Sequence, residues 1–174
     1  MFEKNNRYKI LKIFLDCPLE SFRLREIARL TKISPASVLN YLKEFAEKGL
    51  IEKYEKRGIP FYKAIRDNED FKQYKKLSIL FELHKSGLID YLWDKLAPDT
   101  IILYGSFAKG EGTENSDIDL FIQAPEKKIS LEKYEKQFGR EINIFFDEEF
   151  SRLSNELKNN LLNGIVLKGY IKVF

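Results

Sequence analysis

Residues 105–122, which read GSFAKGEGTENSDIDLFI, decide how the second half of this chain folds. They directly follow a short apolar run of the kind that forms a buried strand. The pattern predicts a strand, a Gly-Ser turn and a second strand that carries Asp117 and Asp119. Because alternate residues of a strand share a face, these two side chains point the same way while their neighbours point into the core. Two carboxylates so placed can hold a magnesium ion together with substrate phosphates.

The Gly-Ser turn is the second part of this pattern. Gly105 lets a ligand approach the backbone closely because it has no side chain, and Ser106 can donate a hydrogen bond to a phosphate oxygen. If a helix follows the turn, its N-terminus favours an anion. Ser116 caps the turn before the second strand. A glycine-rich turn followed by a solvated acidic strand end is the plainer alternative.

The sequence has a Gly-Ser pair, then ten residues, then an Asp-x-Asp pair, with Lys109 between the two pairs and Ser116 just before the first aspartate. This pattern resembles the minimal nucleotidyltransferases of the polymerase-β-like superfamily. The resemblance covers residues 100–146 and, more loosely, the rest of the chain. It implies an α/β nucleotidyltransferase fold that takes Mg²⁺ or Mn²⁺ and an NTP, with ATP the expected nucleotide. It also implies a contact from Lys109 to the triphosphate, for which a solvated loop lysine is the alternative.

In the resembling enzymes a third carboxylate, on a neighbouring strand, completes the metal site and helps to deprotonate the attacking hydroxyl. The matching strand here is 141–146, and Asn143 stands where the family carries aspartate. An amide can offer a carbonyl oxygen to a metal but cannot accept a proton as a general base. Glu141 shares its face, about 6 to 7 Å along the strand. The expected metal ligands are therefore Asp117 and Asp119, with Glu141 and Asn143 as further candidates.

The first third of the chain shows helical periodicity followed by two short strands. Ser34 before Pro35 is an N-cap signal, and Gly49 is a helix-ending signal. Three helices followed by a β-hairpin resemble a winged helix-turn-helix domain, which implies binding to double-stranded DNA. The expected elements are helices 5–16, 22–30 and 35–48 and strands 50–55 and 61–65, joined by residues 56–60.

The charge of the chain is uneven. Residues 1–66 carry 15 Lys and Arg against 8 Asp and Glu, whereas residues 67–174 carry 15 against 19. A basic first part can follow a polyanion. The resemblance places the third helix in the major groove and the hairpin against the DNA backbone. The candidate DNA contacts are Arg25, Ser34, Ser37, Asn40, Tyr41, Lys43, Lys53, Lys56 and Arg57. A winged helix that contacts only protein is the alternative.

We expect three parts, namely a winged helix over 1–66, connector helices over 67–98 and a nucleotidyltransferase domain with a mixed sheet over 99–174. The apolar stripe of the first connector helix, 67–84, is expected at Phe71, Tyr74, Leu77 and Phe81. The second connector helix is expected over 87–97. The last part is expected to contain strands 100–104, 117–123 and 141–146, helices 130–138 and 147–162, and an extended segment 165–173.

Several classes of protein are disfavoured. No apolar run approaches the length of a membrane span, and Lys12 and Asp16 interrupt the N-terminal apolar stretch, unlike in a secretory signal. Cys17 is alone, so no intramolecular disulfide can form and a cytoplasmic setting is expected. The single histidine, His84, has no metal-ligand pattern around it and is expected to be structural.

The leading hypothesis is a DNA-binding protein whose second domain transfers a nucleoside monophosphate from an NTP to a hydroxyl. Domains of this kind can act as antitoxins that nucleotidylate a ribonuclease, and the Arg-x(4–6)-His signature of such a ribonuclease is absent, so that partner would be a separate chain. The second hypothesis is a transcriptional regulator that binds a nucleotide without turnover, which Asn143 favours. A purely structural module is the third. A homodimer through the connector helices is a further expectation, because winged helices commonly bind symmetric sites in pairs.

Overall fold

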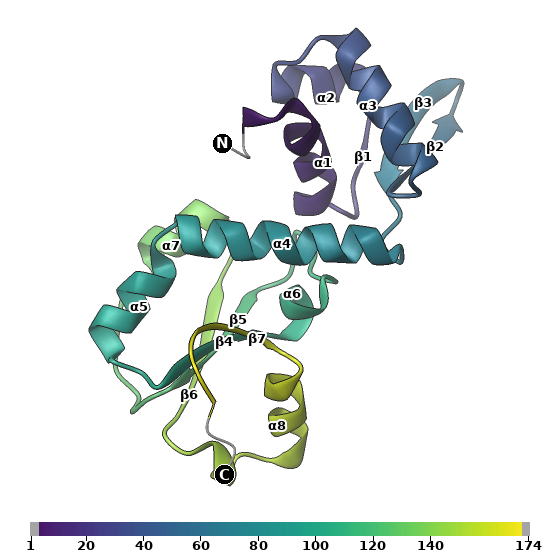
Figure 1. The fold of residues 1–174 in the computed structure, drawn as a ribbon. Coiled ribbons are helices and arrows are strands. Elements are labelled where there is room, and N and C mark those ends of the chain that lie inside the picture. Colours follow the sequence, from purple (N-terminus) through teal and green to yellow (C-terminus); the bar gives the residue numbers. More distant parts are fainter. Residues whose placement is uncertain (1–3, 172–174) are drawn as a thin grey trace. The chain divides into compact units, whose positions relative to one another are not determined.

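Figure 1 shows the computed structural model of the chain, which describes residues 4–171. The chain divides between Lys75 and Lys76 into two compact units. Each unit has its own hydrophobic core, and the long helix α4 (Glu69–Lys85) contributes residues to both. Within the described residues, no helix is long and apolar enough to span a membrane.

The first unit combines three helices with a small antiparallel sheet in the order β1-β3-β2. The expected helices and hairpin are present. Residues 21 and 22, however, pair with β3 as a short strand, so the second helix begins at Leu24 rather than at residue 22. The elements are α1 (Asn6–Asp16), β1 (Ser21–Phe22), α2 (Leu24–Thr31), α3 (Pro35–Glu47), β2 (Ile51–Lys56) and β3 (Ile59–Ala64).

Helix α3 begins as its sequence predicts. Ser34 is the N-cap, with its hydroxyl 3.3 Å from the backbone N–H of Ser37 that donates to it, and Pro35 occupies the first turn. Such caps satisfy backbone donors that have no partner inside the helix. The apolar side chains at helical spacing point into the core of the unit, where Val38, Leu42 and Phe45 are fully buried.

The hairpin turn is tighter than the sequence indicated. Lys56 pairs with Ile59, so only Arg57 and Gly58 form the turn and the expected five-residue connection is wrong. Both turn residues have positive φ, 53° and 72°. This is the backbone of a type I′ turn, which matches the twist of the flanking strands.

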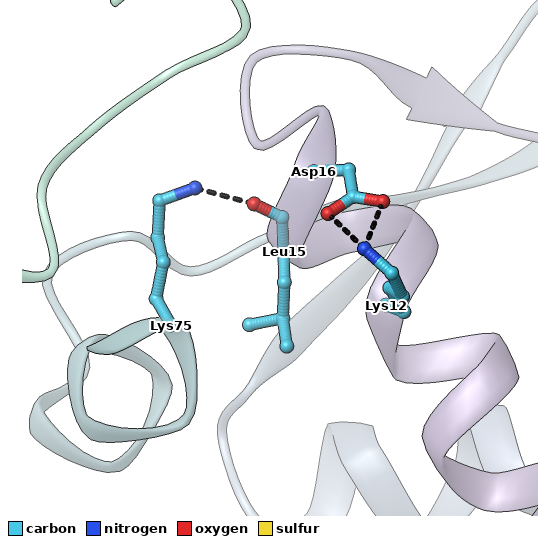
Figure 2. Close-up of polar contacts among 4 residues, drawn as sticks. All are labelled: Lys12, Leu15, Asp16 and Lys75. Carbon is cyan, nitrogen blue, oxygen red and sulfur yellow. Dashed lines mark hydrogen bonds and ion pairs between the residues drawn. The ribbon is translucent and has the colours of Figure 1, made fainter. Parts of the chain in front are cut away.

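Helix α4 is attached to the first core by an aromatic and a charged residue. Phe71 is buried there, and the ammonium of the buried Lys75 donates a hydrogen bond to the backbone C=O of Leu15 in the last turn of α1 (Figure 2). That carbonyl has no partner inside its helix, and a helix C-terminus favours a positive charge. Nearby, Lys12 and Asp16 form an exposed ion pair at 2.8 Å.

The expected stripe on α4 is wrong at two of its four positions. Leu77 is 62% exposed and Tyr74 is 38% exposed. The inner face of the helix includes two polar residues, so counting only apolar residues selected a face rotated away from the core. The buried positions of the helix are Phe71, Lys75, Ser78, Ile79 and Leu83.

The second unit is built on a four-stranded sheet in the order β6-β5-β4-β7. Strands β5 and β6 are parallel and the other pairs are antiparallel, which confirms the expected mixed sheet. After α4, its elements are α5 (Leu88–Leu96), β4 (Thr100–Tyr104), α6 (Gly105–Lys109), β5 (Ile118–Gln123), α7 (Glu132–Phe138), β6 (Ile142–Asp147), the 3₁₀ turn η2 (Phe150–Arg152), α8 (Asn155–Leu162) and β7 (Ile165–Gly169).

Each face of this sheet has its own apolar cluster. On one face, Leu103 and Leu120 pack with buried residues of α4 and α5. On the opposite face, Ile102 and Phe121 pack with η2 and α8, where Leu161 is buried. The end of this second face, beyond the cluster, carries the polar residues of the candidate site.

The expected helix over 147–162 is wrong in its first half. Asp147 belongs to β6, and its carboxylate accepts the backbone N–H of Glu149 at 2.8 Å. Ser154 then starts a new helix by accepting the N–H of Leu157 at 3.2 Å. Side chains that bond to their own backbone in this way interrupt a helix, and apolar periodicity does not reveal them.

Replacing Lys75 by Met should lower the free energy of unfolding by about 1.5–3 kcal/mol, the contribution of a hydrogen bond to a charged group. Methionine keeps the length of the side chain but leaves the carbonyl of Leu15 without its donor. Denaturant unfolding of the whole chain measures the change. Lys48→Met, which removes an exposed ion pair with Glu44, is the control and should cost at most about 1 kcal/mol. Equal losses in the two variants would contradict the role given to Lys75.

Candidate functional site

Three polar side chains form a row across the sheet. Tyr104 of β4 pairs in register with Asp119 of β5, and Asp119 pairs with Asn143 of β6. Residues in register on neighbouring strands share a face, so the three side chains lie next to one another. Asp117, two residues before Asp119, is exposed and lies just before the start of β5 at Ile118. The structure thus brings together both predicted aspartates and Asn143.

Asn143 lies across both carboxylates. Its Nδ2 is 3.3 Å from Asp117 Oδ2 and 3.3 Å from Asp119 Oδ1, and it donates to both. Rotation of the amide about its last side-chain bond would place its carbonyl oxygen in the same position. Two carboxylates and one amide oxygen form an oxygen donor set of the kind that Mg²⁺ takes, together with phosphate oxygens and water. The residues present therefore fit a divalent cation.

The electrostatics of Tyr104, Asp119 and Asn143 also favour a bound cation. Burial raises the pKa of Asp119, and the charge of Asp117 raises it further, while the hydrogen bond from Asn143 opposes the rise. Burial, with the charge of Asp119, also raises the pKa of Tyr104. The ionised form of Asp119 is thus disfavoured in the metal-free protein. A bound cation reverses that balance, because it is the largest charge in such a site.

Gly105 sits directly against Asp119. It has a φ of +71°, and a Cβ built on it would overlap the Asp119 carboxylate. Only glycine fits here, for both reasons. Gly105 begins the short helix α6, whose C-terminal end is closed by the N–H groups of Glu111 and Gly112, which donate to the C=O of Ser106 at 2.8 and 3.1 Å.

The other candidate nucleotide contacts differ in their surroundings. Ser106 is half-buried, and its hydroxyl makes no hydrogen bond to any other described residue. Lys109, the last residue of α6, is exposed. Ser116 has a structural partner, because its hydroxyl accepts the N–H of Thr113 at 2.9 Å. Ser106 and Lys109 are therefore available to a ligand, whereas Ser116 shapes the loop before Asp117.

Sequence reasoning missed Arg140. Its Nη1 donates to the backbone C=O of Thr113 at 2.8 Å and of Ser116 at 3.0 Å, and its guanidinium carbon lies 4.9 Å from the centre of the Phe107 ring. One side chain thereby ties helix α6 and the loop before Asp117 to the start of β6. The sequence next to Arg140 has only one structural signal, the preceding glycine, which ends α7 and does not predict a contact with the distant loop.

Glu141 is exposed just before β6, and its backbone C=O accepts the N–H of Ile118 at 3.0 Å. Across residues 4–171, no three His, Cys, Asp or Glu side chains lie close enough together to hold a metal ion. The carboxylates of the candidate site are thus the pair Asp117 and Asp119, with Asn143 beside them.

In the first unit, three predicted DNA-binding residues lie together on α3. Ser37, Asn40 and Tyr41 line a hollow of about 320 Å³ with Glu44. Arg7 Nη2 lies 2.6 Å from Glu44 Oε1, so part of the negative charge in the hollow is compensated. Hydroxyl, amide and carboxylate groups of this kind can bond to base edges in the major groove.

The remaining candidates for DNA contact divide into two groups. Ser34 is occupied as a helix cap, since its hydroxyl also donates to that of Ser37 at 2.9 Å. The basic candidates have exposed side chains and can reach phosphates. They are Arg25 on α2, Lys43 on α3, Lys53 and Lys56 on β2, and Arg57 in the hairpin turn.

Two family models match separate parts of the chain. Residues 4–52 match a model described as winged helix-turn-helix DNA-binding, and residues 85–167 match one described as nucleotidyltransferase domain. Comparison with curated proteins gave no match, and neither did comparison with solved structures. The first match covers the three helices of the first unit, and the second covers the Asp-x-Asp pair and the strands of the mixed sheet up to residue 167. The chain is thus a winged helix-turn-helix domain followed by a nucleotidyltransferase domain.

Proposed function

We propose that the nucleotidyltransferase domain binds an NTP with Mg²⁺ at Asp117, Asp119 and Asn143 and transfers its nucleoside monophosphate to a hydroxyl. The winged helix binds double-stranded DNA. The observation that carries the proposal is the pair of carboxylates bridged by Asn143 and placed against Gly105. ATP is the nucleotide we would test first, and Mn²⁺ is the alternative metal.

Each residue has a distinct task in this proposal. A divalent ion, when bound, would stabilise the charge that develops as pyrophosphate leaves. The backbone at Gly105 and Ser106 faces the phosphates, and Lys109 adds a positive charge. Asn143 cannot take the proton of the attacking hydroxyl. Asp119 is a poor acceptor while it holds a metal, because a bound cation would lower its pKa, so the proton would pass to water.

A second candidate function is a regulator that binds nucleotide without turnover. Asn143 favours this second function. Its amide donates hydrogen bonds to both carboxylates from the position where the family carries its third acid, and it brings no negative charge. In that case nucleotide binding would change the affinity of the first domain for DNA. An antitoxin-like activity toward a separate ribonuclease remains a proposal that rests on the resemblance. A homodimer, a cytoplasmic location and a connector over 67–98 also remain proposals.

Asp119→Asn should weaken Mg·ATP binding by more than roughly tenfold. Removing only a hydrogen-bond partner of a metal ligand already weakens metal binding by about that factor, and this change removes a ligand itself. The same change should leave unchanged or raise the melting temperature of the metal-free protein, because the pKa of Asp119 is raised and its ionised form is disfavoured. For the same reason, the Mg·ATP affinity of the unaltered chain should fall as the pH drops through that raised pKa. Calorimetric titration and thermal unfolding measure both effects. A fall in both affinity and metal-free stability would point to a structural role instead.

Asn143→Asp separates the two candidate functions. If the missing base limits turnover, this variant should raise the rate of label transfer from ATP by roughly 10²- to 10⁴-fold, the usual contribution of a general base. The added charge should also lower the metal-free melting temperature. Asn143→Ala is the control, which removes the amide without adding a base. Tight ATP binding with no transfer in either the unaltered chain or Asn143→Asp would leave the regulator as the function.

The affinity for duplex DNA should fall steeply with salt, with a slope of about 0.9 per phosphate contact. Lys56→Ala and Arg57→Ala in the hairpin should each reduce the slope by about one. Lys128→Ala, an exposed lysine of the second unit, is the control and should leave the slope unchanged. Fluorescence anisotropy at several salt concentrations gives these slopes. A flat dependence, or no binding to any duplex, would contradict the DNA proposal.

A further inference from the structure

The sheet of the second unit has two edges, and they are built differently. The edge strand β7 carries features that discourage pairing with another strand. Its register shifts beside Ile101 and Ile102, and Lys168 is anchored to Asp90 at 2.9 Å. The edge strand β6, with the sequence Ile-Asn-Ile-Phe-Phe-Asp, contains no Lys, Arg, Pro or Gly. Natural proteins usually protect their sheet edges with such residues, so an unprotected edge calls for an explanation.

The backbone of β6 offers free hydrogen-bonding groups on its outer side. Because Ile118 donates to the C=O of Glu141, the odd-numbered residues of β6 turn their backbone groups toward β5 and the even-numbered ones turn outward. The outward N–H of Ile142 is taken by Glu135 at 3.3 Å. The outward groups of Ile144 and Phe146 have no hydrogen-bond partner among residues 4–171.

An exposed aromatic ring adjoins this edge. Phe145 is 39% exposed and stacks on Phe121, with 6.1 Å between the ring centres. It lies on the same face of β6 as Asn143, two residues along the strand. The edge therefore combines free backbone groups with an apolar contact surface, and both adjoin the candidate metal site.

The charge at both ends of β6 decides what can bind there. Glu141 precedes the strand, Asp147 ends it, and Glu148 follows, with Glu141 and Glu148 exposed. A second copy of the chain, paired antiparallel along this edge, would bring Glu141 opposite Asp147, and like charges opposite each other are destabilising. A nucleic-acid strand meets the same repulsion. A polypeptide with Lys or Arg residues complements these charges.

We propose that the outer edge of β6, with Phe145, binds an extended polypeptide segment that carries Lys or Arg, by addition of a strand to the sheet. In this mode main-chain hydrogen bonds provide affinity, and alternate side chains provide specificity. The segment pairs with Ile144 and Phe146, and its basic residues lie near Glu141 and Glu148. Side chains of the segment on the face of Asn143 then lie next to Asn143, roughly 10 Å across the sheet from the strand that carries Asp119. A serine, threonine or tyrosine there would be the acceptor hydroxyl, a role that rests on the proposed function.

The first test uses the whole chain without nucleotide or metal. A random library of extended peptides is selected on the unaltered protein, and a selected peptide is then added during hydrogen exchange. We expect selected peptides with a net positive charge, and slower exchange of the amides of Ile144 and Phe146. No selection, acidic peptides, or protection confined to other amides would overturn the proposal. The test is independent of catalysis, so failure to bind ATP would overturn the proposed function and leave this proposal standing.

Three variants locate the binding. Phe145→Lys should weaken binding of the selected peptide by roughly tenfold, because it removes an aromatic contact and adds a like charge. Glu148→Lys should shift the selection toward less basic peptides. Val166→Lys makes the same kind of change on the exposed face of the other edge strand and should have no effect. Equal binding to Phe145→Lys and to the unaltered chain, with both folded by thermal unfolding, would refute the assignment to this edge.

Discussion

The nucleotidyltransferase domain depends on one constraint, which is that two carboxylates lie side by side where a buried strand begins. Asp119 is partly withdrawn from water and faces the charge of Asp117, so its ionised form is disfavoured. The surroundings fit this arrangement in two ways. Gly105 leaves room for the carboxylate, and Asn143 donates a hydrogen bond to each aspartate. A site of this kind is short of positive charge and suited to a cation.

Asn143 changes the balance between stability and chemistry at this site. A third carboxylate would add a negative charge beside two others, which disfavours ionisation of all three in the absence of a metal. The amide avoids that repulsion and still offers an oxygen to a metal, but it removes a general base. The substitution thus favours a stable site that binds nucleotide, and it leaves the task of accepting a proton to water.

The sequence was most informative where structure is local. The alternation around Asp117 and Asp119 predicted that their carboxylates lie together, where Asn143 donates to both, and Ser34 and Pro35 predicted the start of α3. It was least informative where distant segments meet. Arg140 holds a loop that lies more than 20 residues earlier in the chain, and Lys75 reaches α1 across 60 residues. Both are polar residues at inner positions, which patterns of apolar residues assign to the surface.

The two domains carry surfaces of opposite character, and this limits what each can bind. Exposed Lys53, Lys56 and Arg57 make the hairpin of the winged helix basic, which suits a polyanion. The open edge of β6 has acidic residues at both ends, and these repel a polyanion. A nucleic acid bound by the first domain is therefore a poor ligand for that edge of the second. The charges thus favour different partners for the two surfaces, with DNA at the hairpin and a basic polypeptide beside the candidate metal site.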